Sequence, residues 1–128
     1  MAVNMNMRIL IVDDFKTMLK IVESMLRQLG FTQIEEATDG TTALQKLRNA
    51  KFDMVLSDWN MEPMTGLDLL KEVRADATLK HLHFILITAE SKTENIIAAK
   101  QAGVNNYIVK PFNANTLKEK LSAVLGQF

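Results

Sequence analysis

The sequence predicts an α/β fold in which helices cover a parallel sheet, and two observations lead to this prediction. Five short aliphatic runs occur along the chain, and amphipathic stretches of helical length separate them without a linker or repeat. Parallel strands produce this alternation, because each return to the same end of a sheet needs a crossover of about a dozen residues or more. The crossovers are expected to be right-handed. The pattern alone leaves the order of the strands open.

The five aliphatic runs are the predicted strands. Four of them are nearly continuous in apolar residues, which is typical of strands covered on both faces. The second run, QIEEA, is more polar and is expected at an edge of the sheet. In chain order the predicted strands are residues 8–12, 33–37, 53–57, 84–88 and 106–110.

The amphipathic stretches predict five helices. The first has apolar residues on one face before a stop at Gly30, namely Met18, Val22, Met25, Leu26 and Leu29. The last repeats this spacing before Gly126, with Leu117, Leu121, Val124 and Leu125. The three middle helices are expected within residues 41–50, 66–75 and 92–103.

Composition excludes several classes of function. The 128 residues fit one domain, and 48% hydrophobic with 23% charged residues is typical of a globular protein. Lys plus Arg and Asp plus Glu number 15 each, so a nucleic-acid partner is not expected. Cysteine is absent, which excludes disulfides and thiolate chemistry. Neither a signal peptide nor a membrane-length apolar run occurs, so we expect a cytoplasmic protein without membrane insertion.

Polar side chains occur where four of the predicted strands end. Asp13 and Asp14 follow the first strand, and Asp58 follows the third. Thr88 ends the fourth strand and Lys110 ends the fifth. The carboxyl ends of parallel strands share one edge of the sheet, where open α/β folds bind ligands. We therefore expect these five side chains in one crevice.

The charges in this crevice predict metal-assisted phosphoryl chemistry. Clustered carboxylates raise one another's pKa unless a cation lies among them. All-oxygen ligands favour a hard divalent ion, and a shallow site that keeps water ligands favours Mg²⁺. Because Mg²⁺ bridges carboxylate and phosphate oxygens, Asp58 is the candidate nucleophile for a phosphoryl group, with Asp13 and Asp14 holding the metal. Lys110 adds a second cation and Thr88 a neutral hydrogen-bond donor.

These motifs resemble response-regulator receiver domains over essentially the whole chain. The matching segments are VDD after the first strand, SDWNM after the third, TA after the fourth and KPF after the fifth. The longer segments VDDFKTM, TAESKTENIIAAKQAG and YIVKPF are similar to single-domain chemotaxis response regulators. The resemblance implies a flavodoxin-like, doubly wound sheet of order 2-1-3-4-5 with five helices. It places the receiver domain at residues 8–128, after an N-terminal tail at 1–7.

The resemblance also implies roles at the metal site. Asp58 would accept a phosphoryl group from a phosphohistidine of a histidine kinase. Mg²⁺ would be held by Asp14, Asp58 and the main-chain carbonyl of Asn60, with Asp13 acting through water. Asn60 and Glu90 match positions that tune how quickly the phosphoryl group is lost. Whether a separate phosphatase acts stays open.

A switch is implied as well. Lys110 and Thr88 would bind the phosphoryl oxygens, Thr88 would move towards them, and Tyr107 would turn inward into the vacated space. This population shift would reshape the face of the fourth helix, fifth strand and fifth helix. In the family this face binds the flagellar motor switch protein, and the protein itself is expected to be a monomer. The residues assigned to the face are Lys92, Ile96, Lys100, Tyr107 and Lys120.

Some residues depart from the usual family pattern. Lys16 and Leu19 occupy rim positions where a smaller polar residue and a basic residue are common. Lys100 adds charge to the fourth helix, and Asn106 replaces a frequent glycine. Because the departures at Thr93, Lys100 and Asn106 lie on or beside the output face, a phosphate sink that drains the kinase without motor binding is an alternative function.

Two further alternatives belong to other classes. A Mg²⁺-dependent aspartyl-phosphate phosphohydrolase would have an acid two residues after its nucleophile, where this chain has Phe15. A flavodoxin-like FMN protein needs hydroxyls and free N–H groups after the first strand. Asp13 and Asp14 would instead repel a bare phosphate, which disfavours the FMN protein. Phe15 in place of the second acid disfavours the phosphohydrolase.

Overall fold

A computed structural model describes residues 3–89 and 92–126. Its five strands form one parallel sheet in the order β2-β1-β3-β4-β5, which confirms the predicted fold and strand order. The strands are β1 (Arg8–Val12), β2 (Gln33–Ala37), β3 (Met54–Asp58), β4 (His83–Thr88) and β5 (Asn106–Val109). Each boundary agrees with the predicted strand to within one residue.

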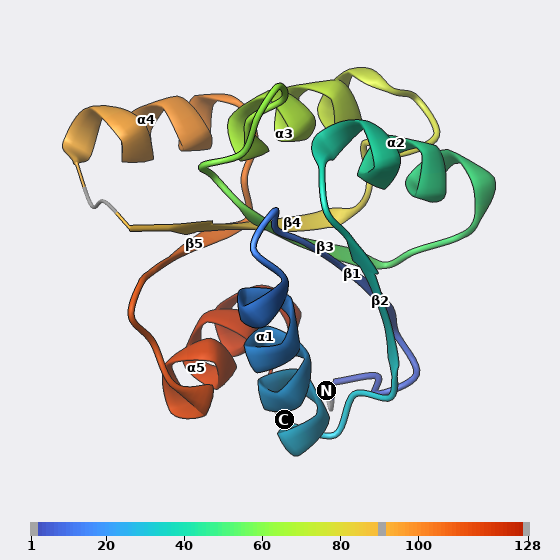
Figure 1. Ribbon diagram of the computed structural model, residues 1–128, viewed down its shortest axis with the longest axis vertical. Helices are drawn as coiled ribbons and strands as arrows, with labels where there is room; N and C mark the ends of the chain where they lie inside the picture. The colour runs from blue at the N-terminus through green and yellow to red at the C-terminus, as the bar shows by residue number, and fades with distance from the viewer. Residues whose placement is uncertain (1–2, 90–91, 127–128) are drawn as a thin grey trace.

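Helices cover both faces of the sheet. Helices α1 and α5 lie on one face, and α2, α3 and α4 lie on the other (Figure 1). They span α1 (Lys16–Gln28), α2 (Gly40–Asn49), α3 (Gly66–Ala75), α4 (Thr93–Gln101) and α5 (Ala114–Leu125). None of the helices within the described ranges combines the length and apolar character needed to cross a membrane.

Two apolar clusters form the core, one on each face of the sheet. Successive residues of the central strands point to opposite faces, so Leu10 and Val55 enter one cluster while Ile9 and Met54 enter the other. Strands β1, β3 and β4 are buried almost throughout. The fifth strand lies at the edge that the predicted order gives it, but it is less covered than its apolar run predicts, because only Ile108 in it is buried.

Helix α1 packs against the second of these clusters. Its spacing places Leu19, Val22 and Leu26 inside. The interpretation of Leu19 as a rim residue is therefore wrong, because its side chain is 3% exposed and belongs to the core. Val3 and Met7, which precede β1, are also buried in this cluster.

Local sequence fixes where several helices begin. The carboxylate of Asp39 accepts from Thr42 N–H and caps α2, and the side chain of Asn113 does the same for α5 through Thr116 N–H. Thr65 and Asp68 form a reciprocal capping box at the start of α3. The start of α3 matters for the site, because this helix follows the loop that leaves β3.

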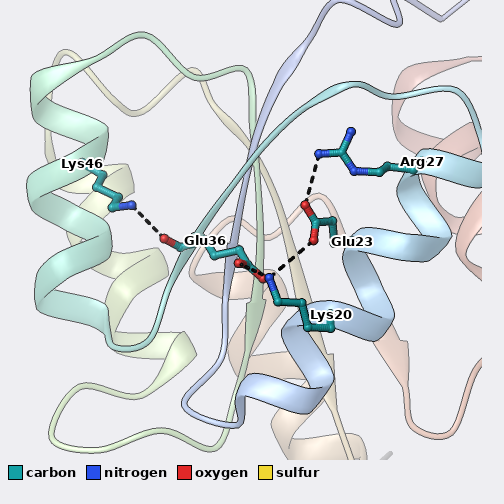
Figure 2. Close-up of polar contacts among 5 residues, drawn as sticks. All are labelled: Lys20, Glu23, Arg27, Glu36 and Lys46. Atoms are coloured by element: carbon teal, nitrogen blue, oxygen red, sulfur yellow. Dashed lines mark hydrogen bonds and ion pairs between the residues drawn. The ribbon is translucent and has the colours of Figure 1, made fainter.

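The outer edge of β2 carries a network of charges (Figure 2). Lys20 Nζ of α1 lies 3.2 Å from Glu36 Oε1, and Lys46 Nζ of α2 donates to the Glu36 carbonyl oxygen at 2.8 Å. Edge strands expose backbone groups that can pair with another chain, and nearby lysines discourage such pairing. The polar character of QIEEA is thus explained by its edge position.

Candidate functional site

The two acids after β1 occupy different environments. Asp13 N–H donates to the Ala37 carbonyl oxygen at 3.1 Å, which continues the pairing of β1 with β2. The Asp13 carboxylate accepts from Phe15 N–H at 2.9 Å, so its side chain closes the turn into α1. Asp13 is buried, whereas Asp14 is exposed to solvent.

Asp58 is the last residue of β3, and its neighbours hold its backbone firmly. The strand pairs Asp58 with Ile87, and Trp59 N–H donates to the Ile87 carbonyl oxygen at 2.8 Å. Ser57 Oγ donates to the Asp58 carbonyl oxygen at 3.0 Å. Asp58 is buried, and it lies on a central strand that pairs with β1 on one side and β4 on the other.

Gly66, at the start of α3, packs directly onto this backbone. A Cβ atom added at Gly66 would lie 2.3 Å from the Asp58 carbonyl oxygen. Only glycine permits this approach, which brings α3 and its preceding loop against the end of β3. Sequence reasoning missed both Ser57 and Gly66; the signal for the latter was a glycine at the start of a predicted helix.

Thr88 and Lys110 lie at the ends of the next two strands. Thr88 ends β4 and is buried, and Lys110 N–H donates to its carbonyl oxygen at 2.7 Å. The Lys110 side chain turns towards the acids, with Nζ 2.8 Å from Asp58 Oδ1 and 3.9 Å from Asp13 Oδ2. The Lys110–Pro111 peptide bond is cis. The strand ends thus bring an ammonium group and buried carboxylates together.

The three acids form a compact cluster. Carboxylate oxygens of Asp13, Asp14 and Asp58 all lie within 4.8 Å of one another. Burial raises the pKa of Asp13 to about 6, and the negative charges of Asp58 and Asp14 add to this effect. The Phe15 N–H and the Lys110 ammonium lower the pKa of Asp13, but they do not cancel the effect of burial. The Lys110 ammonium therefore offsets only part of the negative charge of the three acids.

The donor set fits a magnesium ion. Asp58 Oδ1 is buried, and although Lys110 Nζ lies within ion-pair distance, this oxygen has no aligned hydrogen bond from any described residue. Carboxylate oxygens are the ligands that Mg²⁺ prefers, and the exposure of Asp14 leaves room for water ligands. Within the described chain, no backbone N–H donates to the Asn60 carbonyl oxygen.

The residues assigned to the output face lie on α4, β5 and α5. Lys92 and Lys100 are exposed and Ile96 is half-buried, all on or at the start of α4. Tyr107 on β5 and Lys120 on α5 are in contact, with Lys120 Nζ 4.7 Å from the centroid of the Tyr107 ring. Glu90 lies outside the described residues.

The comparisons with known proteins agree with this geometry. The family model for the response regulator receiver domain matches residues 9–122. The chain belongs to this family. It is 61% identical over 121 residues to chemotaxis protein CheY-3 of Vibrio cholerae, covering 94% of this chain and 93% of that protein.

Solved receiver structures are similar as well. One is the chemotaxis response regulator CheY4 of Vibrio cholerae, with a TM-score of 0.86 and 36% identity, covering 94% of this chain and 99% of that one. Another is the receiver domain of a sensor histidine kinase from Pseudomonas aeruginosa, with a TM-score of 0.84 and 28% identity, covering 95% and 99%. That structure has a magnesium ion coordinated in its active-site cleft.

Proposed function

We propose that this receiver domain is a phosphorylation-switched signalling protein of a chemotaxis two-component system. It accepts a phosphoryl group on Asp58 from a phosphohistidine of a histidine kinase. The observation that carries the proposal is the pairing of Lys110 with buried Asp58 beside two further acids, one of them exposed. The homology to chemotaxis protein CheY-3 supports the same pathway.

The transfer uses side chains at the ends of four strands. An oxygen of the Asp58 carboxylate attacks phosphorus, the new P–O bond forms as the P–N bond breaks, and the imidazole of the kinase keeps the electron pair. Asp14, Asp58 and the Asn60 carbonyl would hold Mg²⁺, with Asp13 acting through water, and the ion would supply positive charge to offset the charge of the phosphoryl oxygens. Lys110 pairs with one phosphoryl oxygen, and the Thr88 hydroxyl donates to another.

Phosphorylation then changes the protein's surface. When Lys110 and Thr88 bind the phosphoryl group, Thr88 moves towards it and Tyr107 turns inward. These contacts exist only in the modified protein. They therefore shift the equilibrium between two conformations of the face formed by α4, β5 and α5 towards the switched conformation. Asn60 and Glu90 tune the lifetime of the acyl phosphate. The domain has no substrate turnover of its own beyond gaining and losing this group.

The proposed target of the switched face is the flagellar motor switch protein, and the domain acts in the cytoplasm as a monomer. A phosphate sink would use the same site without this target. Equilibrium binding to a motor-switch peptide, measured with and without beryllium fluoride and Mg²⁺, separates the two functions. A gain in affinity supports motor binding, whereas equal affinity in both states would leave the phosphate sink. The Asp58→Asn variant is the control, since it should show no gain.

A further inference from the structure

Tyr107 lies on the edge strand β5 and contacts both an apolar cluster and a lysine side chain. Its half-buried ring packs against the apolar cluster beneath α2, α3 and α4. Lys120 of α5 places its Nζ 4.7 Å from the centroid of this ring. Helices α4 and α5 lie on opposite faces beside β5 (Figure 1). A cation at this distance over an aromatic ring is attracted to it.

Asn106 connects the two residues that form this contact. Its Nδ2 donates to the Lys120 carbonyl oxygen at 3.0 Å. Its Oδ1 accepts from the Tyr107 N–H at 2.9 Å. Both bonds are partly buried, where hydrogen bonds are stronger than in water. One side-chain amide therefore fixes the backbone of both Tyr107 and Lys120, and so sets the position of the ring relative to the ammonium.

We propose that Asn106 and Lys120 form a latch that keeps Tyr107 in its half-buried position and thereby sets the threshold of the switch. The latch rests on the proposed function, in which Tyr107 turns inward after phosphorylation. Before it turns, the ring must leave Lys120, and a contact of this class biases a two-state equilibrium by about two- to fivefold. Where the family commonly has glycine, neither bond of Asn106 can form. Asn106 and Lys120 act by positioning Tyr107, and neither touches a reacting atom.

The test follows Tyr107 in the 128-residue chain, which contains one tyrosine. Ring-labelled tyrosine is observed by NMR in the absence and presence of acetyl phosphate with Mg²⁺. Lys120→Met removes the cation with little change in side-chain length, and Asn106→Ala removes both hydrogen bonds. Lys51→Met is the matched control, because Lys51 is exposed in the segment between α2 and β3 and its substitution removes the same charge.

The latch predicts a shift in the unmodified protein. Lys120→Met should move the Tyr107 resonances part of the way towards the positions that the parent adopts with acetyl phosphate, equivalent to about a two- to fivefold change in population. Asn106→Ala should move them in the same direction. The phosphorylated fraction at a fixed acetyl phosphate concentration should also rise, because the coupling is reciprocal. A loss of packing alone would lower Tm without raising this fraction.

Two results would overturn the latch while the proposed function stands. They are unmoved Tyr107 resonances in unmodified Lys120→Met, and an equal shift in Lys51→Met. If the Tyr107 resonances of the parent protein do not change on addition of acetyl phosphate with Mg²⁺, the proposed function is contradicted. The latch, which rests on it, is then contradicted as well.

Discussion

Lys110 Nζ lies 2.8 Å from Asp58 Oδ1, and this ion pair connects the end of β5 with the end of β3. Strand β4 lies between these strands, and Lys110 N–H donates to the carbonyl oxygen of Thr88 at its end. The ammonium group thus reaches across the strand that carries the threonine. It offsets the charge of a buried carboxylate, and it lies beside the oxygen that we propose as the phosphoryl acceptor.

Replacing Lys110 with Met should separate phosphorylation from the response. Asp58 can still be labelled by acetyl phosphate, but the phosphoryl group loses a cation that holds it in the switched state. The Tyr107 resonances should then stay near their unmodified positions in the labelled variant. Mg²⁺ affinity should rise several-fold at the same time, because the acids lose a competing positive charge. A full Tyr107 response in the labelled variant would contradict this role.

Removing the exposed acid of the cluster should weaken metal binding. Trp59, the only tryptophan, is half-buried next to Asp58 and should report Mg²⁺ through its fluorescence. Asp14→Ala should lower Mg²⁺ affinity by about tenfold or more. Glu62→Gln is the control, because this exposed acid lies in the neighbouring loop and is no proposed ligand. Equal Mg²⁺ titrations for Asp14→Ala and the parent would exclude Asp14 as a ligand.

The buried acid Asp13 should make stability depend on pH when Mg²⁺ is absent. Its pKa is raised from 3.8 to about 6, chiefly by burial, so the folded state binds this proton more tightly than the unfolded state does. The free energy of unfolding should therefore fall as pH rises from about 4 to about 6. The contribution of this one group is about 3 kcal/mol.

Asp13→Asn isolates this contribution, because the amide stays neutral at every pH. In EDTA the variant should be more stable than the parent above pH 6 by up to about 3 kcal/mol, and the difference should vanish near pH 4. Urea unfolding across this range measures it. Saturating Mg²⁺ should shrink the difference, since the metal stabilises the ionised carboxylates. Parallel pH profiles for the two proteins would show that Asp13 is not the titrating group.

Two glycines at the first position of helices should differ in their tolerance of alanine. A Cβ at Gly66 would lie 2.3 Å from the Asp58 carbonyl oxygen, whereas a Cβ at Gly40 would meet the side chain of Met64. A backbone oxygen on a central strand cannot move aside. The Sδ and Cγ atoms of Met64 can rotate away, although its Cβ, 2.9 Å from the added atom, is fixed to the loop backbone. Gly66→Ala should cost at least about 1–3 kcal/mol of unfolding free energy and should cost more than Gly40→Ala. Thermal unfolding of the two variants compares them directly, and equal losses would contradict this packing.

The location of the site could be predicted from the sequence, because the parallel arrangement of the strands determines which residues meet. Asp13, Asp58, Thr88 and Lys110 each end an apolar run, and parallel strands bring such ends to one edge. The contacts among them could not be predicted in this way. That Lys110 Nζ reaches Asp58 over Thr88 depends on strand order, which the alternating pattern leaves open.

The errors of prediction have physical causes as well. The apolar run of β5 is typical of a strand covered on both faces. However, β5 has a neighbouring strand on one side only, and most of its residues are partly exposed. Leu19 was assigned to the rim by resemblance, although its spacing to Val22 and Leu26 is helical and places it on the buried face. At Leu19, the helical spacing of apolar residues indicates burial correctly, whereas the family resemblance did not.

The central claim is tested most directly by intact-mass analysis of the protein incubated with acetyl phosphate and Mg²⁺, followed by peptide mapping of the modified residue. The account predicts a gain of one phosphoryl group, located on Asp58, that disappears in EDTA and in Asp58→Asn. A phosphoryl group found on another residue, or retained at full yield in Asp58→Asn, would contradict it.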